Sequence, residues 1–182
     1  MKPNLSHLFA LVLTVVLMAC SSDDSSSIPD EATNEFIFNG VTYNLVSAII
    51  TDENTSNDDP SDISISLFNK TSSEITNNEN LSDISYVYFD FEDVTIQNMT
   101  YTQIEDYDVS VNGSIVDSEF NPGTILLSDN NPESDVYAQS ASVTVTNFTE
   151  FNIVFTFTFT RNDGQVISGS YDGNYFAPNG ID

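Results

Sequence analysis

Apolar and polar residues alternate along most of the chain from Glu35 onward, which is the pattern of half-buried β-strands. No long window shows the spacing of an amphipathic helix, and polar segments such as 71–82 are expected to be loops. The pattern predicts an all-β domain, an antiparallel β-sandwich of about nine strands, with a closed up-and-down β-barrel as the alternative. Four of these strands form two hairpins, and the other expected strands are 62–68, 84–91, 107–111, 124–127 and 136–146.

The first hairpin is centred on Asn39-Gly40, a dipeptide that favours the two-residue type I′ turn. This turn sets Phe38 opposite Val41. It also sets Phe36 opposite Tyr43, so the four apolar side chains share one face. We therefore expect the folded domain to begin with this hairpin.

The second hairpin turns within the segment 161–165, which allows two registers. A two-residue loop would set phenylalanine opposite serine and threonine opposite isoleucine. A three-residue loop pairs Phe159 with Ile167 and Phe157 with Gly169, and we favour it because it keeps apolar residues together, with Gly164 in the left-handed region. The first strand carries an apolar stripe that is expected to face the core rather than to form a ligand platform. The stripe comprises Phe151, Ile153, Phe155, Phe157 and Phe159.

An apolar run over residues 8–18 follows the basic residue Lys2. Its length fits the central region of a secretory signal peptide and is too short to span a membrane. The run ends in Leu17-Met18-Ala19-Cys20, which resembles the bacterial lipobox. The resemblance implies cleavage before Cys20, acylation of its thiol and of the new amino terminus, and attachment to a membrane through the acyl chains. The predicted parts are a lipoprotein signal peptide (1–19), an acylated, disordered polar tether (20–34) and a single β-sandwich domain (35–182).

The tether opens with Ser21-Ser22-Asp23-Asp24 and continues with three serines. This opening is similar to the tethers of small outer-membrane lipoproteins of the Bacteroidota, in which acidic residues behind the acylated cysteine mark export to the outer face. The resemblance implies an outer-membrane location with display at the cell surface. A generic Ser/Asp linker is the alternative interpretation of the segment, and the periplasmic face is the alternative location.

Charge is the most extreme property of the composition, since 3 basic and 28 acidic residues give a formal net charge of −25. A field of this sign repels nucleic acid, so we exclude a nucleic-acid partner. Loss of residues 1–19 would remove the single histidine, His7. The rest of the chain then lacks the residues of a Ser-His-Asp or Cys-His nucleophile and of the usual zinc sites. The acidic side chains favour solubility first, and otherwise divalent cations or basic partners.

Oxygen ligands concentrate in the segment 129–135, where acidic or amide side chains occupy alternate positions. This is the spacing by which a compact loop wraps a calcium ion. The match to an EF-hand is incomplete, because Ser134 and Ser140 stand where glycine and glutamate are expected. A calcium ion is one hypothesis for this loop, and a solvated acidic loop is the other. The candidate ligands are Asp129, Asn131, Glu133 and Asp135.

Carboxylates are the remaining candidates for catalytic groups, because a glycosidase needs two of them, one on each side of the bond that it cleaves. The missing tryptophan weakens a sugar-stacking cleft, although eight tyrosines can replace it. Arg161, beside the second turn, is interpreted as a surface counter-ion. The densest carboxylates near predicted strands, among which no pair stands out, are Asp90, Glu92, Asp93, Glu105, Asp106 and Asp108.

The favoured function is a non-catalytic binding or accessory module for a glycan or a protein. Two other classes of function stay open, namely a structural or adhesive surface protein and a carboxylate-dependent hydrolase such as a glycosidase. The sequence names no ligand and indicates no oligomeric state. Loops at the ends of the sandwich are the expected place for a site.

Overall fold

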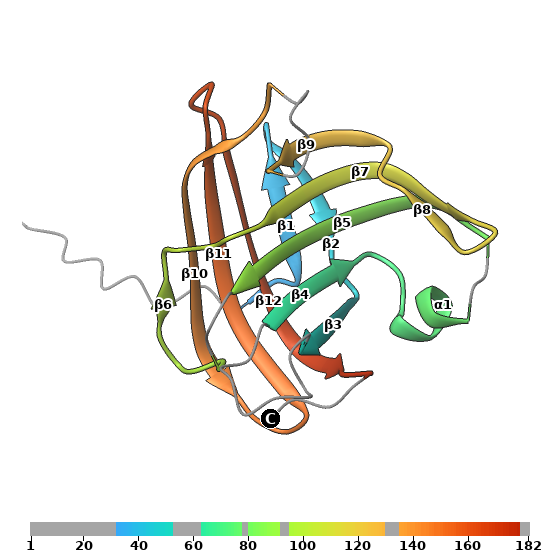
Figure 1. The fold of residues 1–182 in the computed structure, drawn as a ribbon, viewed down its shortest axis with the longest axis horizontal. Helices are drawn as coiled ribbons and strands as arrows, with labels where there is room; N and C mark the ends of the chain where they lie inside the picture. Colours follow the sequence, from blue (N-terminus) through green and yellow to red (C-terminus); the bar gives the residue numbers. More distant parts are fainter. Residues whose placement is uncertain (1–31, 53–62, 78–79, 92–94, 130–134, 179–182) are drawn as a thin grey trace, which may run out of the picture. The chain divides into compact units, whose positions relative to one another are not determined.

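The computed structural model describes residues 32–52, 63–77, 80–91, 95–129 and 135–178, within the compact unit Glu31–Asp182. The first six elements are β1 (Glu35–Phe38), β2 (Val41–Asn44), β3 (Ser47–Asp52), β4 (Ile63–Phe68), α1 (Ser72–Thr76) and β5 (Leu81–Phe91). The others are β6 (Thr100–Tyr101), β7 (Tyr107–Val116), β8 (Glu119–Asn121), β9 (Thr124–Ser128), β10 (Ala138–Phe148), β11 (Asn152–Arg161) and β12 (Val166–Phe176), as Figure 1 shows.

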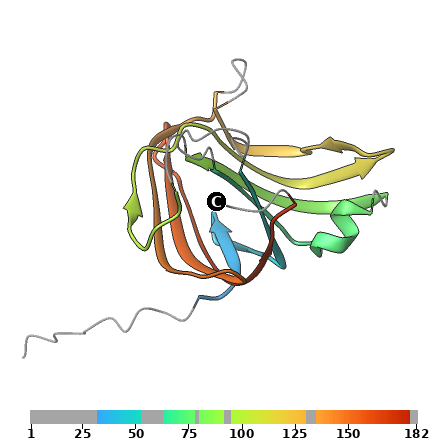
Figure 2. The same cartoon turned by 60° about the horizontal axis from the view of Figure 1, so that its bottom comes forward.

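The strands form two layers that face each other (Figure 1, Figure 2). One layer has the order β6-β10-β11-β12-β1-β2, and the other has the order β3-β4-β5-β7, with β8 and β9 both paired to β7. The layers are continuous where Tyr175 and Phe176 of β12 pair in parallel with Ala48 and Ile49 of β3. The domain is an all-β sandwich, as predicted. Two details of the prediction are wrong, since the described residues form twelve strands instead of about nine and one strand pair is parallel.

The first hairpin has the predicted register. Phe38 pairs with Val41, and Phe36 pairs with Tyr43. The turn residues Asn39-Gly40 have φ angles of 51° and 75°, as a type I′ turn requires. The rings of Phe36 and Tyr43 stack with their centroids 4.7 Å apart. Because β1 also pairs with β12, the hairpin becomes part of the first layer.

The β11–β12 hairpin also has the register of the three-residue loop. Phe159 pairs with Ile167, Phe157 pairs with Gly169, and Gly164 has a φ angle of 81°. A Cβ atom on Gly169 would lie 2.5 Å from the ring of Phe157. Glycine is therefore required where this ring covers the backbone of β12.

The core lies between the layers and combines the apolar stripe of β11 with inward side chains of β4, β5 and β7. Phe155 meets Phe89 of the opposite layer edge to face, with ring centroids 5.6 Å apart. The stripe is a core face, as predicted, except at its first residue. Phe151 is 67% exposed because β11 begins at Asn152, and Phe151 lies in the turn that follows β10.

The alternation pattern does not predict β3, β6, β8 or α1. β3 is buried on both faces over much of its length, so its apolar residues are consecutive and do not alternate with polar ones. β6 and β8 have only two and three residues, which is too short for an alternation to be recognised. α1 lies in a segment expected to be a loop. Its N-terminus has a complete capping box, in which the Glu74 N–H donates to Thr71 Oγ1 (3.3 Å) and the Thr71 N–H donates to the Glu74 carboxylate (2.8 Å).

Arg161 is 8% exposed, so its interpretation as a surface counter-ion is wrong. Its guanidinium donates to the Leu126 carbonyl and to the Asp163 carboxylate, each at 2.8 Å. The guanidinium carbon also lies 5.1 Å from the centre of the Phe38 ring. A planar group with five donors suits this place. Arg161 therefore connects β11 in one layer to β9 in the other.

Candidate functional site

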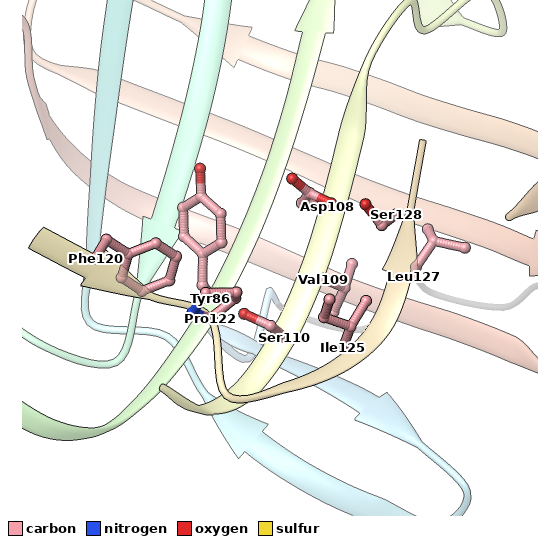
Figure 3. A pocket seen from close by; sticks show the side chains of 9 residues that line it. All are labelled: Tyr86, Asp108, Val109, Ser110, Phe120, Pro122, Ile125, Leu127 and Ser128. Carbon is pink, nitrogen blue, oxygen red and sulfur yellow. The ribbon is translucent and has the colours of Figure 1, made fainter. Parts of the chain in front are cut away.

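A pocket of about 310 Å³ lies over β5, β7 and β9. Tyr107 and Val109 of β7 belong to the core, and the alternate residues Asp108 and Ser110 face the other side of the sheet. The pocket is thus on the outer face of the second layer. Its lining consists of Tyr86, Asp108, Val109, Ser110, Phe120, Pro122, Ile125, Leu127 and Ser128, as Figure 3 shows.

One wall of the pocket exists because β7 changes its partner along its length. Residues 108–111 pair with β9, and residues 114–116 pair with β8. The change occurs at Asn112, whose φ angle is 56°. A Cβ atom on Gly123 would lie 2.4 Å from the Asn112 carbonyl oxygen, so glycine is required where the β8–β9 connection passes β7. This path brings Phe120 to the pocket.

Asp108 is half-buried and supplies a carboxylate to the pocket. Burial raises the pKa of Asp108, while a hydrogen bond from the Ser128 hydroxyl lowers it. The negative charges of Asp106 and Asp129 raise the pKa of Asp108 further. The ionised form of Asp108 is therefore less favourable in the folded protein than in water, and a ligand that donates hydrogen bonds or brings positive charge would stabilise it.

Tyr86 supplies an aromatic side of the pocket and lies between Phe120 and Asp108 (Figure 3). Its ring meets Phe120 edge to face, with centroids 5.0 Å apart. Burial raises the pKa of Tyr86 to about 12, so its hydroxyl is protonated at neutral pH. The two rings give the pocket an apolar surface on which a flat or ring-shaped ligand can pack.

Ser110 is 2% exposed, and its Oγ has no hydrogen-bond partner in the described part of the chain. An unpaired buried hydroxyl costs about 1–3 kcal/mol. Ser110 lines the pocket, where a ligand that displaces the atoms covering its Oγ can supply the missing hydrogen bond. Ser110 is therefore the residue of this pocket that most directly indicates a ligand.

Comparison with protein-family models, with curated proteins and with solved structures finds no match to this chain. The interpretation of the pocket therefore depends on its own chemistry. That chemistry is an apolar, aromatic wall together with a few polar groups that can fix a ligand's orientation, which is the usual composition of small-molecule sites.

The predicted calcium loop lies partly outside the described residues, since Asn131 and Glu133 fall in the gap 130–134. Asp129 and Asp135 are described and exposed. The Asp129 N–H donates to the Tyr107 carbonyl at 3.0 Å. Within the described ranges, no group of three or more His, Cys, Asp or Glu side chains could hold a metal ion. Calcium binding by the complete loop stays a prediction.

Among the described carboxylates considered for catalysis, only Asp108 lines the pocket, although Asp106 is near enough for its charge to raise the pKa of Asp108. Asp90 and Asp106 are neighbours through a hydrogen bond from the Asp90 N–H to the Asp106 carbonyl, and the Glu105 N–H donates to the Asp90 carbonyl. Glu92 and Asp93 lie outside the described residues. The described lining of the pocket thus holds one carboxylate, whereas glycoside hydrolysis by the usual mechanism needs two.

The predicted acylation site, Cys20, also lies outside the described residues. Among the helices of the described ranges, none has the length and apolar character to cross a membrane.

Among the residues that line the pocket, the sequence pattern singles out Asp108 alone. Tyr86, Ser110, Phe120 and Ser128 come from four strands, and their proximity depends on the irregular path of β7. A local signal existed in Asn121-Pro122-Gly123, a turn sequence that brings a second strand back to β7.

Proposed function

We propose that this protein is a lipid-anchored, non-catalytic binding module displayed on the outer membrane, and that its outer-face pocket binds a sugar unit of a glycan. The buried Ser110 hydroxyl without a partner is the observation that carries the proposal. A sugar hydroxyl can donate to or accept from it, and the same ring can donate to Asp108. Tyr86 and Phe120 provide the apolar surface for the face of the sugar ring.

The size of the pocket supports this ligand class. A volume of about 310 Å³ is at the lower end of small-molecule pockets. It suits one or two sugar units of a longer chain, with the rest of the glycan outside. The strong negative charge of the protein argues against an acidic glycan, so neutral and basic glycans are the expected ligands.

Truncation of Phe120 tests the proposal. Phe120 is 39% exposed, so Phe120→Ala removes a wall of the pocket at a small cost in stability. The control is Phe176→Ala, because Phe176 is 42% exposed and lies on β12. The full chain in mild detergent is applied to an array of neutral, acidic and amino glycans. We expect Phe120→Ala to lose the signal and Phe176→Ala to keep it. Absence of any signal with the unaltered protein, or equal signals with both variants, would contradict the proposal.

The anchor is supported by Leu17-Met18-Ala19-Cys20 and by the acidic tether behind it. Mass spectrometry of the protein from its own cells should show an acylated Cys20 at the amino terminus. Protease added to intact cells should degrade the domain. An unmodified Cys20 would contradict the anchor, and protection from protease would contradict display at the surface.

A further inference from the structure

We propose that the pocket selects a glycan with a free amino group, and that the protonated amine lies between the Asp108 carboxylate and the Ser110 hydroxyl. The inference rests on the proposed glycan-binding function and names the substrate class of the same pocket. The observations that carry it are the charge around Asp108, the unpartnered Ser110 and the aromatic side of the pocket.

The pocket has negative charge without a balancing positive charge in the described part of the chain. The charges that act on Asp108 are those of Asp106 and Asp129, and both are negative. Neither of the two basic side chains of the described residues lines the pocket. Arg161 binds Leu126 and Asp163, and the charge of Lys70 acts on Glu74 beside α1. A cationic ligand is the group that this charge distribution attracts.

The two polar groups of β7 lie on the same side of the sheet. Asp108 and Ser110 are two residues apart on the same face, so their Cα atoms are separated by about 7 Å along the strand. An ammonium nitrogen between them can donate to the carboxylate and to the Ser110 Oγ at the same time. This second hydrogen bond satisfies the buried hydroxyl, which has no partner in the described part of the chain.

The rest of the pocket suits the sugar ring that carries the amine. Phe120 lies at the end of the pocket away from Asp108, and Tyr86 lies between them (Figure 3). A ring packed on these side chains extends its substituent toward β7. A neutral sugar could make the same hydrogen bonds, but a bond from an ammonium group to a carboxylate is about twice as strong as one between neutral groups. The amine also offsets the repulsion among Asp106, Asp108 and Asp129.

Three trisaccharides that differ in one substituent provide the test. They are β-1,4-linked glucosamine, N-acetylglucosamine and glucose trimers, which carry an amine, an acetamide and a hydroxyl at the same carbon. Calorimetric titration uses the full chain in detergent, at a pH where the amine is protonated. We expect the glucosamine trimer to bind about tenfold or more tightly than the others, which corresponds to one net charge-assisted bond.

Two variants and a control test which residues produce the preference for the amine. Asp108→Asn should bind the three trimers alike, whereas Ser110→Ala should bind the glucosamine trimer more weakly and keep part of the preference. Asp172→Asn on β12 is the matched control, because Asp172 is exposed and distant in the sheet order from β7. It should leave all affinities unchanged.

The outcomes separate the inference from the function on which it rests. Equal affinities for the three trimers, reduced by Phe120→Ala, would overturn the amine preference and leave glycan binding intact. An amine preference that survives Asp108→Asn would also overturn the inference. If neither the trimers nor the glycan array give binding, both the inference and the proposed function fail.

Discussion

Asp108 is subject to two opposing requirements. Its burial and its acidic neighbours destabilise its charge, and the same charge is what an amine ligand needs. The pKa of Asp108 is higher in the folded protein than the ordinary aspartate value, so folding favours its protonated form. The wild-type protein therefore loses stability as the pH rises from the ordinary value through the raised pKa. A residue that lowers stability while it serves binding is common at functional sites.

Asp108→Asn should accordingly stabilise the protein at neutral pH, and the difference should disappear below the ordinary aspartate pKa, where both side chains are neutral. Urea unfolding at the two pH values measures this effect. The variant should at the same time lose the preference for the glucosamine trimer. A variant that is less stable than the wild type at neutral pH would contradict the role given to Asp108.

Glycine is required at position 169 because neighbouring atoms leave no room for a Cβ atom. A Cβ atom there would lie 2.5 Å from Phe157 and 2.6 Å from the Glu35 carbonyl oxygen. Gly169→Ala should lower the free energy of unfolding by about 1–3 kcal/mol, because the core ring must move. The adjacent Ser168→Ala should change it by less than about 0.5 kcal/mol in urea unfolding. Equal stabilities of the two variants would show that Phe157 relaxes freely.

At the scale of elements, side chains bridge the layers where no strand ladder does. Among the described strands, neither β7 nor β9 pairs with β10 or β11. Arg161 of β11 donates to the Leu126 carbonyl of β9, and the Ala138 N–H of β10 donates to the Tyr107 hydroxyl of β7 at 3.0 Å. These bonds connect the two layers on the side where the layers share no strand pairing.

Arg161→Met keeps the apolar stem and removes the bridge. We expect a loss of about 1–3 kcal/mol in the free energy of unfolding, because the buried Leu126 carbonyl loses its donor. Asp163→Asn removes the charge of the more exposed partner and should cost less than about 1 kcal/mol. Urea denaturation of both variants gives the comparison. A larger loss for Asp163→Asn would mean that the ion pair, and not the bond to β9, is what stabilises this region.

The elements that the sequence predicts are those with strong local signals. Asn39-Gly40 and Gly164 determine two turns, and the phenylalanine alternation of β11 chooses between registers. β8 was not predicted because its turn uses Asp117 and Ser118 at φ angles of 52° and 68°, where glycine or asparagine is the usual signal. The pocket was not predicted because its residues meet through the bend of β7 at Asn112, which is a tertiary property.

At the scale of the molecule, the excess of negative charge is the property with the largest effect. The chain has 28 acidic and 3 basic residues, so mutual repulsion should make stability depend on cations. General screening acts through ionic strength, whereas a bound calcium ion acts by mass action on the folded state.

Melting experiments in calcium, in magnesium and in sodium chloride of matched ionic strength separate these effects. A calcium ion held by the loop 129–135 would raise the melting temperature more in calcium than in the other salts, with EGTA as the metal-free reference. Replacement of Asp129 and Glu133 by alanine should abolish the difference. Equal rises in all salts would contradict the calcium site and leave the loop as a solvated acidic surface.

Mapping where a glycan contacts the protein tests whether the outer-face pocket is the binding site. Amide chemical shifts of the full chain in detergent are recorded while each of the three trisaccharides is added to millimolar concentration. We expect the largest shift changes at Asp108, Ser110, Phe120 and Ser128, with the glucosamine trimer giving the strongest response. Changes concentrated on the outer face of β10, β11 and β12, or no change with any trimer, would contradict the assignment of the pocket as the binding site.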